Sequence, residues 1–314
     1  MQNTLKTIWI VTIIATGIVS TSNAGTIVAW GYDTYGEVSN APTGTGFTTI
    51  AAGFLDGYAL TANGSIAAWG LDSDWDVSNA PTGTGFKAIA GRLYNGYALT
   101  ANGSIVAWGN NNNGEVSNAP TGTGFKAIAA VAYGGYALTA NGSIAAWGDD
   151  MWGEVSNAPT GTGFKAIAAG FVDGYALKAN GSIVAWGDDT YGEVSNAPTG
   201  TGFKAIAGMT YGGYALKANG SVVAWGYAVS PPPPTAGFTA IAAGESDCYA
   251  LTANGSIAAW GDDTYGQVSN APTETGFTAI AAGGWDGYAL TPEPASAILI
   301  GAGLVFARLR QRHR

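Results

Sequence analysis

The tripeptide Ala-Trp-Gly recurs along this chain at an almost constant interval. Five successive gaps between its tryptophans are 39 residues and the sixth is 35, for Trp30, Trp69, Trp108, Trp147, Trp186, Trp225 and Trp260. A second peptide, Gly-Tyr-Ala-Leu or a close variant, follows each of them, at Tyr58, Tyr97, Tyr136, Tyr175, Tyr214, Tyr249 and Tyr288. A fixed period of this size indicates an array of one supersecondary unit, because such a unit buries its faces only against its neighbours.

Each repeat contains three short apolar runs that we expect to be strands. In one repeat these runs are 125–130, 135–139 and 143–147. The pair Asn141-Gly142 separates the last two runs and is a strong hairpin signal, since both residues accept positive φ. The residues after Trp-Gly predict a loop followed by room for a short outer strand. Each repeat is therefore predicted to be a meander of three to four strands.

The two ends of the array decide between an open solenoid and a closed ring. The last repeat stops at Thr291 without a third strand, and the segment Thr26–Trp30 supplies that strand at the other end of the chain. Pairing of 26–30 with 287–291 would remove an exposed edge, whereas a solenoid would carry polar caps. The predicted fold class is all-β: a seven-bladed β-propeller over 25–291, in which the N- and C-terminal strands share one blade.

The segments outside the array predict export. Residues 1–24 contain Lys6, an apolar run and a small-residue cleavage site after Ala24, which is typical of a signal peptide with its helix. Residues 292–314 contain Pro292-Glu293-Pro294, then the apolar stretch 295–307, expected to be a short hydrophobic helix, and then an arginine-rich tail. This order resembles the PEP-CTERM sorting signal of exopolysaccharide-producing Gram-negative bacteria.

That resemblance implies a route for the protein. It implies transient inner-membrane anchoring through 295–307, removal of the tail by an exosortase-type enzyme, and release to the cell surface or extracellular matrix. The processing residues would be Ala24, Pro292, Glu293 and Pro294. The alternative is a simple membrane anchor, although the 13 apolar residues are fewer than the roughly 20 that span a bilayer.

The repeat resembles the regulator of chromosome condensation repeat family. The family pattern appears here as Ala281-Ala282-Gly283, Ala289-Leu290 and Trp260–Gln267. The resemblance covers 25–291 and implies a seven-bladed propeller, closest in wording to a bacterial secreted branch that includes a β-lactamase-inhibiting propeller. Where the family often has histidine before the Ala-Leu strand, this chain has Asp56, Asn95, Gly134, Asp173, Gly212, Asp247 and Asp286.

Charge and composition exclude several functions. Residues 25–294 carry seven basic and 21 acidic residues, a formal charge of −14 that would repel nucleic acid, so the family's chromatin role does not carry over. The single histidine, His313, lies in the tail, which excludes histidine-dependent triads and zinc sites. Cys248 replaces a repeat glycine and is predicted to be a small packed residue. We expect no metal and no cofactor; the acidic segment 72–76 favours a solvated loop over a calcium site.

Paired carboxylates recur in the linkers between repeats, as in Asp150 and Glu154. Two carboxyl groups can hydrolyse a glycosidic bond when they are correctly spaced. A catalytic pair is normally unique, however, and these pairs recur in one repeat after another. They favour turn formation by aspartate, and we expect no enzyme.

Aromatic residues in the loops are the candidate ligand-binding residues, because loops are normally polar. The candidates are Tyr32, Tyr35, Trp75, Trp152, Tyr191 and Tyr265. Rings beside carboxylates suit sugar stacking or protein contacts, whereas packing between neighbouring repeats is the structural alternative. The expected function is an exported, non-catalytic binding or scaffold module, with exopolysaccharide or a surface protein as its partner. The alternatives are a carbohydrate-active enzyme and an inhibitor-like, protein-binding propeller.

Overall fold

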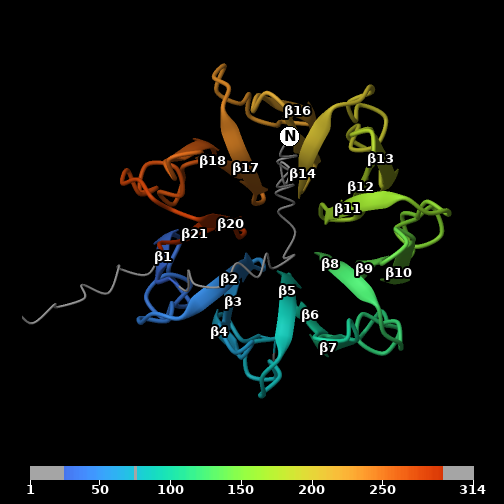
Figure 1. Ribbon diagram of the computed structural model, residues 1–314, viewed down its shortest axis with the longest axis horizontal. Helices are drawn as coiled ribbons and strands as arrows, with labels where there is room; N and C mark the ends of the chain where they lie inside the picture. The colour runs from blue at the N-terminus through green and yellow to red at the C-terminus, as the bar shows by residue number, and fades with distance from the viewer. Residues whose placement is uncertain (1–24, 74–75, 293–314) are drawn as a thin grey trace, which may run out of the picture.

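The computed structural model describes residues 25–73 and 76–292. The regular secondary structure in that part of the chain consists of β-strands alone. They form seven three-stranded sheets, arranged as blades around a central axis (Figure 1). The predicted all-β, seven-bladed propeller is thereby confirmed. The signal helix predicted within 1–24 and the hydrophobic helix predicted within 295–307 lie outside the described residues.

Each blade has its first strand nearest the axis and its third strand at the periphery. Blades 1 to 3 are β2 (Phe47–Ala52), β3 (Asp56–Thr61) and β4 (Ile66–Gly70); β5 (Phe86–Arg92), β6 (Asn95–Thr100) and β7 (Ile105–Gly109); β8 (Phe125–Val131), β9 (Gly134–Thr139) and β10 (Ile144–Gly148). Blades 4 to 6 are β11 (Phe164–Ala169), β12 (Asp173–Lys178) and β13 (Ile183–Gly187); β14 (Phe203–Met209), β15 (Gly212–Lys217) and β16 (Val222–Gly226); β17 (Phe238–Ala243), β18 (Asp247–Thr252) and β19 (Ile257–Gly261). Blade 7 consists of β20 (Ala279–Ala282), β21 (Asp286–Leu290) and β1 (Ile27–Gly31).

The ring closes as predicted, because β1 completes the last blade. It pairs antiparallel with β21 in a register that sets Ile27 opposite Leu290 and Trp30 opposite Gly287. Beyond this ladder, the amide of Thr291 donates to the carbonyl of Thr26 at 3.0 Å. The two ends of the array therefore lie side by side in one sheet.

The Asn-Gly hairpins form, but their geometry differs from the expected one. Gly64 has a φ of 76°, whereas Asn63 has no positive φ. The Gly64 amide donates to the Thr61 carbonyl at 2.8 Å, and the Thr61 amide donates to the Ser65 carbonyl at 3.0 Å. This is a type I turn followed by a left-handed glycine, the common three-residue hairpin loop, so only the glycine needs the left-handed region.

The outer fourth strand, for which the sequence left room, is absent from the described residues. The linker after β1 instead folds on one side chain: Oδ1 of Asp33 accepts from the amides of Val38 at 3.0 Å and Ser39 at 2.8 Å. Amides that bond to a side chain in this way cannot bond to a neighbouring strand. Each blade therefore has three strands.

The hydrophobic core is divided into seven clusters, one for each junction between blades. At one junction Tyr58 and Leu60 of β3 pack against Ile89, Ala98 and Trp108 of blade 2. The second strand is sandwiched between two neighbouring blades, which explains why all but its last residue is buried. The junctions on both sides of the closing blade each contain the same kinds of large side chain, a tyrosine, a tryptophan, a phenylalanine, a leucine and an isoleucine.

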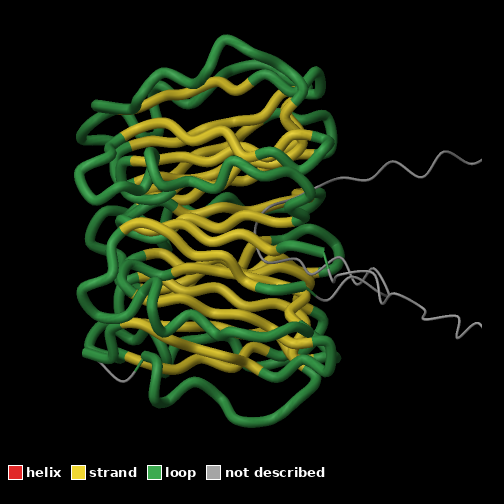
Figure 2. The backbone as a smooth tube through the Cα atoms, turned by 90° about the vertical axis from the view of Figure 1, so that its left-hand side faces the viewer, coloured by secondary structure: helices red, strands yellow, loops and turns green. Residues whose placement is uncertain are grey.

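The loops lie on two opposite faces of the ring, with the strands between them (Figure 2). The hairpin face contains the Asn-Gly hairpins and the starts of the first strands. Each hairpin is hydrogen-bonded to the start of the first strand of the next blade, as where the Phe86 amide donates to the Gly64 carbonyl at 3.1 Å. The turn face contains the short turns between first and second strands and the beginnings of the linkers. The start of a linker and the short turn of the same blade are hydrogen-bonded there: the Leu71 amide donates to the Leu55 carbonyl at 2.8 Å.

Candidate binding surface

The linker turn fixes where its aromatic side chain points. In the linker after β1, Oε2 of Glu37 accepts from the Tyr35 amide at 2.8 Å, while Oδ1 of Asp33 accepts from the amides of Val38 and Ser39. Glu37 is buried and Tyr35 is 47% exposed. The buried Glu37 and the exposed Asp33 therefore hold the backbone of the turn between them, and the ring is left on the surface.

The same arrangement recurs in the linkers after β10 and β13. Asp150 accepts from Val155 at 2.9 Å and from Ser156 at 2.8 Å, and Glu154 accepts from the Trp152 amide at 2.8 Å. The hydrogen bond from Ser156 is the main cause that holds the pKa of Asp150 below its ordinary value. Burial raises the pKa of Glu154. The predicted turn chemistry of these carboxylate pairs is confirmed.

Three of the six predicted aromatic residues come together with two other rings across blades 6, 7 and 1. We call this set the seam cluster: Tyr32, Tyr35, Phe54, Tyr265 and Trp285. The ring of Tyr32 lies 4.8 Å from that of Tyr265 and 5.5 Å from that of Trp285, both edge-to-face. Phe54 contacts Trp285 at 4.9 Å, and Tyr35 lies 6.3 Å from Tyr32. Residues far apart in sequence thus meet where the ring closes.

A second group of rings spans blades 4 and 5. We call it the tyrosine cluster: Tyr191, Tyr211 and Tyr227. The Tyr191 ring lies 4.9 Å from Tyr211 and 5.3 Å from Tyr227. The exposed fractions are 45%, 46% and 60% in that order. This cluster is more open to solvent than the seam cluster, in which Tyr32, Phe54 and Trp285 are half-buried.

The remaining two predicted residues, Trp152 and Trp75, belong to neither cluster. Trp152 is 48% exposed beside the still more exposed Met151. Trp75 lies outside the described residues. In blade 2 the linker position that holds Tyr35, Trp152, Tyr191 or Tyr265 elsewhere is occupied by Asn113, whose amide donates to Glu115 in the same way. The position therefore accepts a ring but does not need one.

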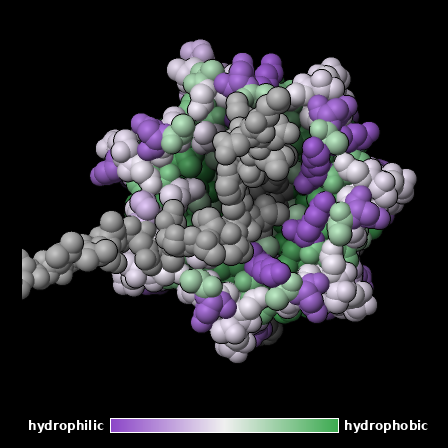
Figure 3. Space-filling model, viewed as in Figure 1, coloured by the Kyte–Doolittle hydropathy of each residue, from purple (hydrophilic) through white to green (hydrophobic). Residues whose placement is uncertain are grey.

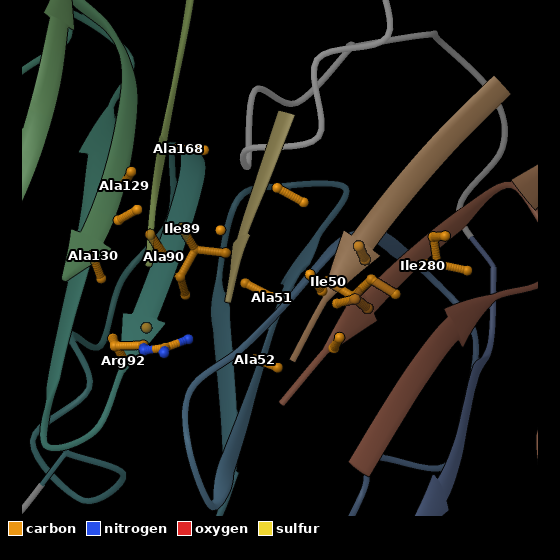
Figure 4. Close-up of a pocket in the computed structure, with 18 residues that line it drawn as sticks. Ile50, Ala51, Ala52, Ile89, Ala90, Arg92, Ala129, Ala130, Ala168 and Ile280 are labelled. Carbon is orange, nitrogen blue, oxygen red and sulfur yellow. The ribbon is translucent and has the colours of Figure 1, made fainter. Parts of the chain in front are cut away.

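A channel of about 150 Å³ runs along the axis. The first strands of all seven blades line it, mostly with alanine and glycine, together with Ile50, Ile89 and Ile280 (Figure 4). Arg92 lies at the turn-face end of β5 and is its one charged lining residue. Burial lowers the pKa of Arg92, and the charges of Glu245 and Asp173 oppose that shift.

Four aspartates begin the second strands of their blades and are almost fully buried: Asp56, Asp173, Asp247 and Asp286. Burial is the main cause that raises the pKa of each of them, to about 7 for Asp247. Tyrosine hydroxyl groups donate to two of them: Tyr175 to Asp173, and Tyr288 to Asp286 at 3.1 Å. These carboxyl groups lie inside the wall of the ring, out of reach of a polymer on its surface.

Metal-ligating clusters and membrane-spanning helices are both absent from residues 25–73 and 76–292. In residues 25–73 and 76–292 no group of three or more His, Cys, Asp and Glu side chains is arranged to hold a metal ion. The same part of the chain contains no helix long and apolar enough to cross a membrane. Cys248 is buried in the core of blade 6, as predicted for a small packed residue, and burial raises the pKa of its thiol.

Comparison with known proteins identifies the repeat and the fold. Residues 238–267 match the model of the Regulator of chromosome condensation (RCC1) repeat. Prp20p from Saccharomyces cerevisiae, described with its binding to Gsp1p and histones, is 15% identical with a TM-score of 0.68, over 89% of this chain and 94% of that one. Yeast RCC1 (Prp20) bound to Kap60 is 16% identical with a TM-score of 0.69, over 94% and 96%.

A third similar structure is the ectodomain of the Physcomitrella patens receptor kinase CR4. It is 24% identical with a TM-score of 0.62, over 76% of this chain and 68% of that one. No curated protein matches the sequence. At these identities the similarity establishes an RCC1-like propeller fold and says nothing of the ligand.

Proposed function

We propose that this protein is an exported, non-catalytic binding module whose turn face takes glycan chains of a surface or matrix polysaccharide. Its route would follow from the terminal segments. Signal cleavage would occur after Ala24, and Pro292-Glu293-Pro294 would direct the chain to an exosortase-type enzyme. Residues 295–307 would anchor it transiently in the inner membrane before its release to the cell surface or matrix of a Gram-negative bacterium.

The observation that carries the proposal is the grouping of half-exposed rings on one face. Tyr35 and Tyr265 are each more than 40% exposed, and both are attached to linkers clamped by side-chain hydrogen bonds. Exposed apolar rings on a rigid turn cost little conformational entropy when they bind, which favours a stacking contact.

The carboxylate geometry favours binding over hydrolysis. The exposed member of each linker pair, such as Asp189, already accepts two main-chain amides, at 3.0 Å and 2.8 Å. Its partner Glu193 is buried and holds the Tyr191 amide at 2.8 Å. A carboxylate that is committed to the backbone in this way is a poor general acid or base, so a carbohydrate-active enzyme is the weaker alternative.

A protein partner is the second candidate. Tyrosine and tryptophan are the residues that most often dominate protein interfaces, and the tyrosine cluster presents three of them together. Proteins with this fold bind other proteins, as described for Prp20p with Gsp1p and histones. An inhibitor-like propeller belongs to this class.

The test is saturable binding of the purified protein to the exopolysaccharide of the producing strain. The double variant Tyr35→Asn with Tyr265→Asn removes two rings and uses the residue that blade 2 has at this position. We expect binding to weaken by at least about tenfold, because buried aromatic contacts contribute on the order of 1 kcal/mol or more each. The variant Asn113→Ala, in the linker without a ring, is the matched control and should bind as the wild type does.

Two outcomes would contradict the glycan assignment. Unchanged binding by the double variant would remove the seam cluster from the site. A wild type that does not bind the polysaccharide, but retains a surface protein through the same tyrosines, would favour the second candidate.

A further inference from the structure

Every lysine in residues 25–73 and 76–292 lies on the hairpin face. Four follow the first phenylalanine of the first strand in blades 2 to 5, and two end the second strands of blades 4 and 5. We call them the lysine arc: Lys87, Lys126, Lys165, Lys178, Lys204 and Lys217. Blades 1, 6 and 7 have threonine after the phenylalanine, at Thr48, Thr239 and Thr278. The arc therefore covers one side of the face.

Three amines of the arc, those of Lys87, Lys126 and Lys204, bond to main-chain carbonyls. Nζ of Lys87 donates to Ala101 at 2.6 Å, and Nζ of Lys204 donates to Phe238 at 3.1 Å. Lys178 lies over the Phe164 ring at 5.9 Å. Carbonyls and rings hold these amines without neutralising them. Figure 3, viewed onto the hairpin face, shows hydrophilic side chains over β5, β8 and β11 as well as around the rim.

The carboxylates are distributed in the opposite way. The linker aspartates Asp33, Asp150, Asp189 and Asp263 lie at the turn-face ends of third strands, and the buried aspartates lie at the turn-face ends of second strands. Glu274, before β20, is an exposed carboxylate nearer the hairpin face, and it lies in a blade without a lysine. In an acidic protein the hairpin face is thus locally basic.

The chain leaves the ring on this same face. Gly25 exchanges two hydrogen bonds with Phe47 at the start of β2, at 2.7 Å and 3.1 Å, and Oγ1 of Thr26 lies 2.6 Å from Oγ1 of Thr291. Only Pro292, Glu293 and Pro294 separate Thr291 from the apolar stretch 295–307. Three residues extend over at most about 10 Å.

We propose that the hairpin face docks on an anionic membrane surface, with the lysine arc against acidic lipid headgroups. The proposal rests on the proposed function, in which 295–307 inserts into the membrane. A tether of about 10 Å holds the face within about one Debye length of the headgroups, where unscreened lysines attract anionic lipid. The turn face with its aromatic clusters then points away from the membrane.

The lysine arc could instead meet an anionic polysaccharide, which shares the negative charge. The position of the chain exit favours the membrane, because a face tethered by three residues to an inserted segment lies against lipid before it meets any polymer. The experiment below separates the two.

The test is competition of the full-length chain between vesicles of phosphatidylcholine and vesicles of an equal mixture of phosphatidylcholine and phosphatidylglycerol. The double variant Lys126→Thr with Lys165→Thr uses the residue that blades 1, 6 and 7 have at this position, where Oγ1 of Thr48 bonds to Leu60. We expect its preference for anionic vesicles to fall by about fivefold for each lysine. The preference should also fall as salt is raised.

The control removes the same net charge from the other face. Asn110→Asp with Asn111→Asp changes two turn-face residues to the aspartates that blades 3, 4 and 6 have there, at Asp149, Asp150, Asp188, Asp189, Asp262 and Asp263. It should keep the wild-type preference. If the preference for anionic vesicles fell equally in both double variants, the net charge of the protein would determine the preference and the position of the lysines would not. That result would overturn the proposal.

Two further outcomes separate membrane docking from the anchor on which it rests. A wild type that fails to float with neutral vesicles would contradict the anchor in the proposed function itself. A wild type that floats, and whose lysine variant loses binding to a soluble polyuronate without losing its vesicle preference, would overturn membrane docking in favour of the polysaccharide.

Discussion

At the scale of single residues, one pair of positions explains much of the variation among the repeats. Four blades have glycine after the first strand and aspartate three residues later: Gly53 with Asp56, Gly170 with Asp173, Gly244 with Asp247, and Gly283 with Asp286. A Cβ on Gly53 would lie 1.9 Å from Oδ1 of Asp56. The carboxyl group therefore occupies the space of the missing side chain.

Blades 3 and 5 reverse this arrangement. They have Val131 and Met209 at the glycine position, and Gly134 and Gly212 at the aspartate position. Val131 and Met209 are buried, so the space is again filled. In these blades the larger residue continues the first strand by one position, which gives β8 and β14 seven residues where β2 has six.

This packing predicts coupling between the two positions in blade 1. Gly53→Ala should destabilise the protein by about 1–3 kcal/mol, because its methyl group overlaps the Asp56 carboxyl group. Adding Asp56→Gly should recover part of that loss, as blades 3 and 5 do. Urea unfolding of both single variants and the double variant measures a coupling energy, expected to be about 1 kcal/mol or more. Strict additivity would show that the two positions do not share one space.

The alternation itself is visible in the sequence, since the repeats can be compared position by position. The cause of the alternation is not visible in the sequence, because the distance between two loop positions is fixed only when the strands on both sides are placed. The same limit applies to the seam cluster. Tyr32 and Tyr265 were predicted as separate loop residues, and only ring closure brings their rings to 4.8 Å.

At the scale of strands and blades, each junction is held by a tyrosine and a tryptophan. The tyrosine of one blade meets the tryptophan of the next edge-to-face, with centroids 5.2 Å apart for Tyr97 and Trp147. Both rings also donate to one carbonyl of the linker between them: Tyr97 at 3.0 Å and Trp147 at 2.9 Å, each to Glu115. The two recurrent peptides of the sequence are therefore the two halves of one inter-blade contact.

At the junction of blades 3 and 4 the Tyr136 hydroxyl is buried without a hydrogen-bond partner, and only Trp186 donates to the linker carbonyl. Blade 6 is the exception for the tryptophan. Trp260 pairs with Tyr214 at 5.5 Å, but its Nε1 is buried without a hydrogen-bond partner. Two changes coincide there. Cys248 stands opposite Trp260 where the other blades have a glycine flat against the indole, and the linker before this blade is four residues shorter. Tyr214 bonds alone to the Ser230 carbonyl at 2.8 Å.

This exception provides a matched pair of variants. Trp147→Phe loses ring volume and a buried hydrogen bond, whereas Trp260→Phe loses the same ring volume and no hydrogen bond. We expect Trp147→Phe to cost about 1 kcal/mol more free energy of unfolding, which is the usual net contribution of one such bond. Urea unfolding followed by circular dichroism measures both. Equal costs would mean that the indole bond to Glu115 contributes nothing to the junction.

The strands were largely predictable and the linkers were not. Asn-Gly pairs, apolar runs and the offset ends gave three strands per blade and the closing strand before the fold was known. The prediction of an outer strand was wrong because Asp33 accepts hydrogen bonds from the amides of Val38 and Ser39. Composition alone does not decide whether such amides bond to a side chain or to a neighbouring strand. The hairpin type differed for a similar reason, since the turn needs a left-handed φ only at glycine.

At the scale of the whole molecule, closure gives the ring two chemically different faces. One carries the rings and most of the exposed carboxylates, and the other carries the lysines and the chain ends. The signal for the lysine arc was present in the sequence as a Phe-Lys pair in four successive repeats. The sequence alone does not show that this pair marks a surface, because only the path of the chain places all six lysines on the same face.

The buried aspartates also give the whole molecule a pH dependence. Burial is the main cause that raises the pKa of Asp247 from 3.8 to about 7; the nearby hydroxyl group of Tyr249 opposes this, and the charges of Asp262 and Glu245 add to it. A carboxyl group that binds its proton more tightly in the folded state stabilises the fold below its unfolded pKa. That stabilisation is lost as the pH rises through the folded value.

We therefore expect the urea midpoint to fall between pH 4.5 and pH 8, with Asp247 alone contributing at most about 4 kcal/mol. Asp56, Asp173 and Asp286, whose pKa values are also raised by burial, act in the same direction. The exposed linker aspartate Asp263, whose pKa is lowered by hydrogen bonds, acts in the opposite sense. Its stabilising contribution is lost as the pH falls from the unfolded value of 3.8 through its folded pKa, where the midpoint should fall again.

The variant Asp247→Asn isolates this effect, because blade 2 already has Asn95 at the same position. It should flatten the decline between pH 4.5 and pH 8, while Asp263→Asn, on the exposed linker that follows the same blade, should leave the decline unchanged. A wild-type midpoint that rises from pH 5 to pH 7 would mean that these carboxyl groups are ionised inside the ring wall. The tyrosine hydroxyl groups beside them would then have to be their stabilising partners.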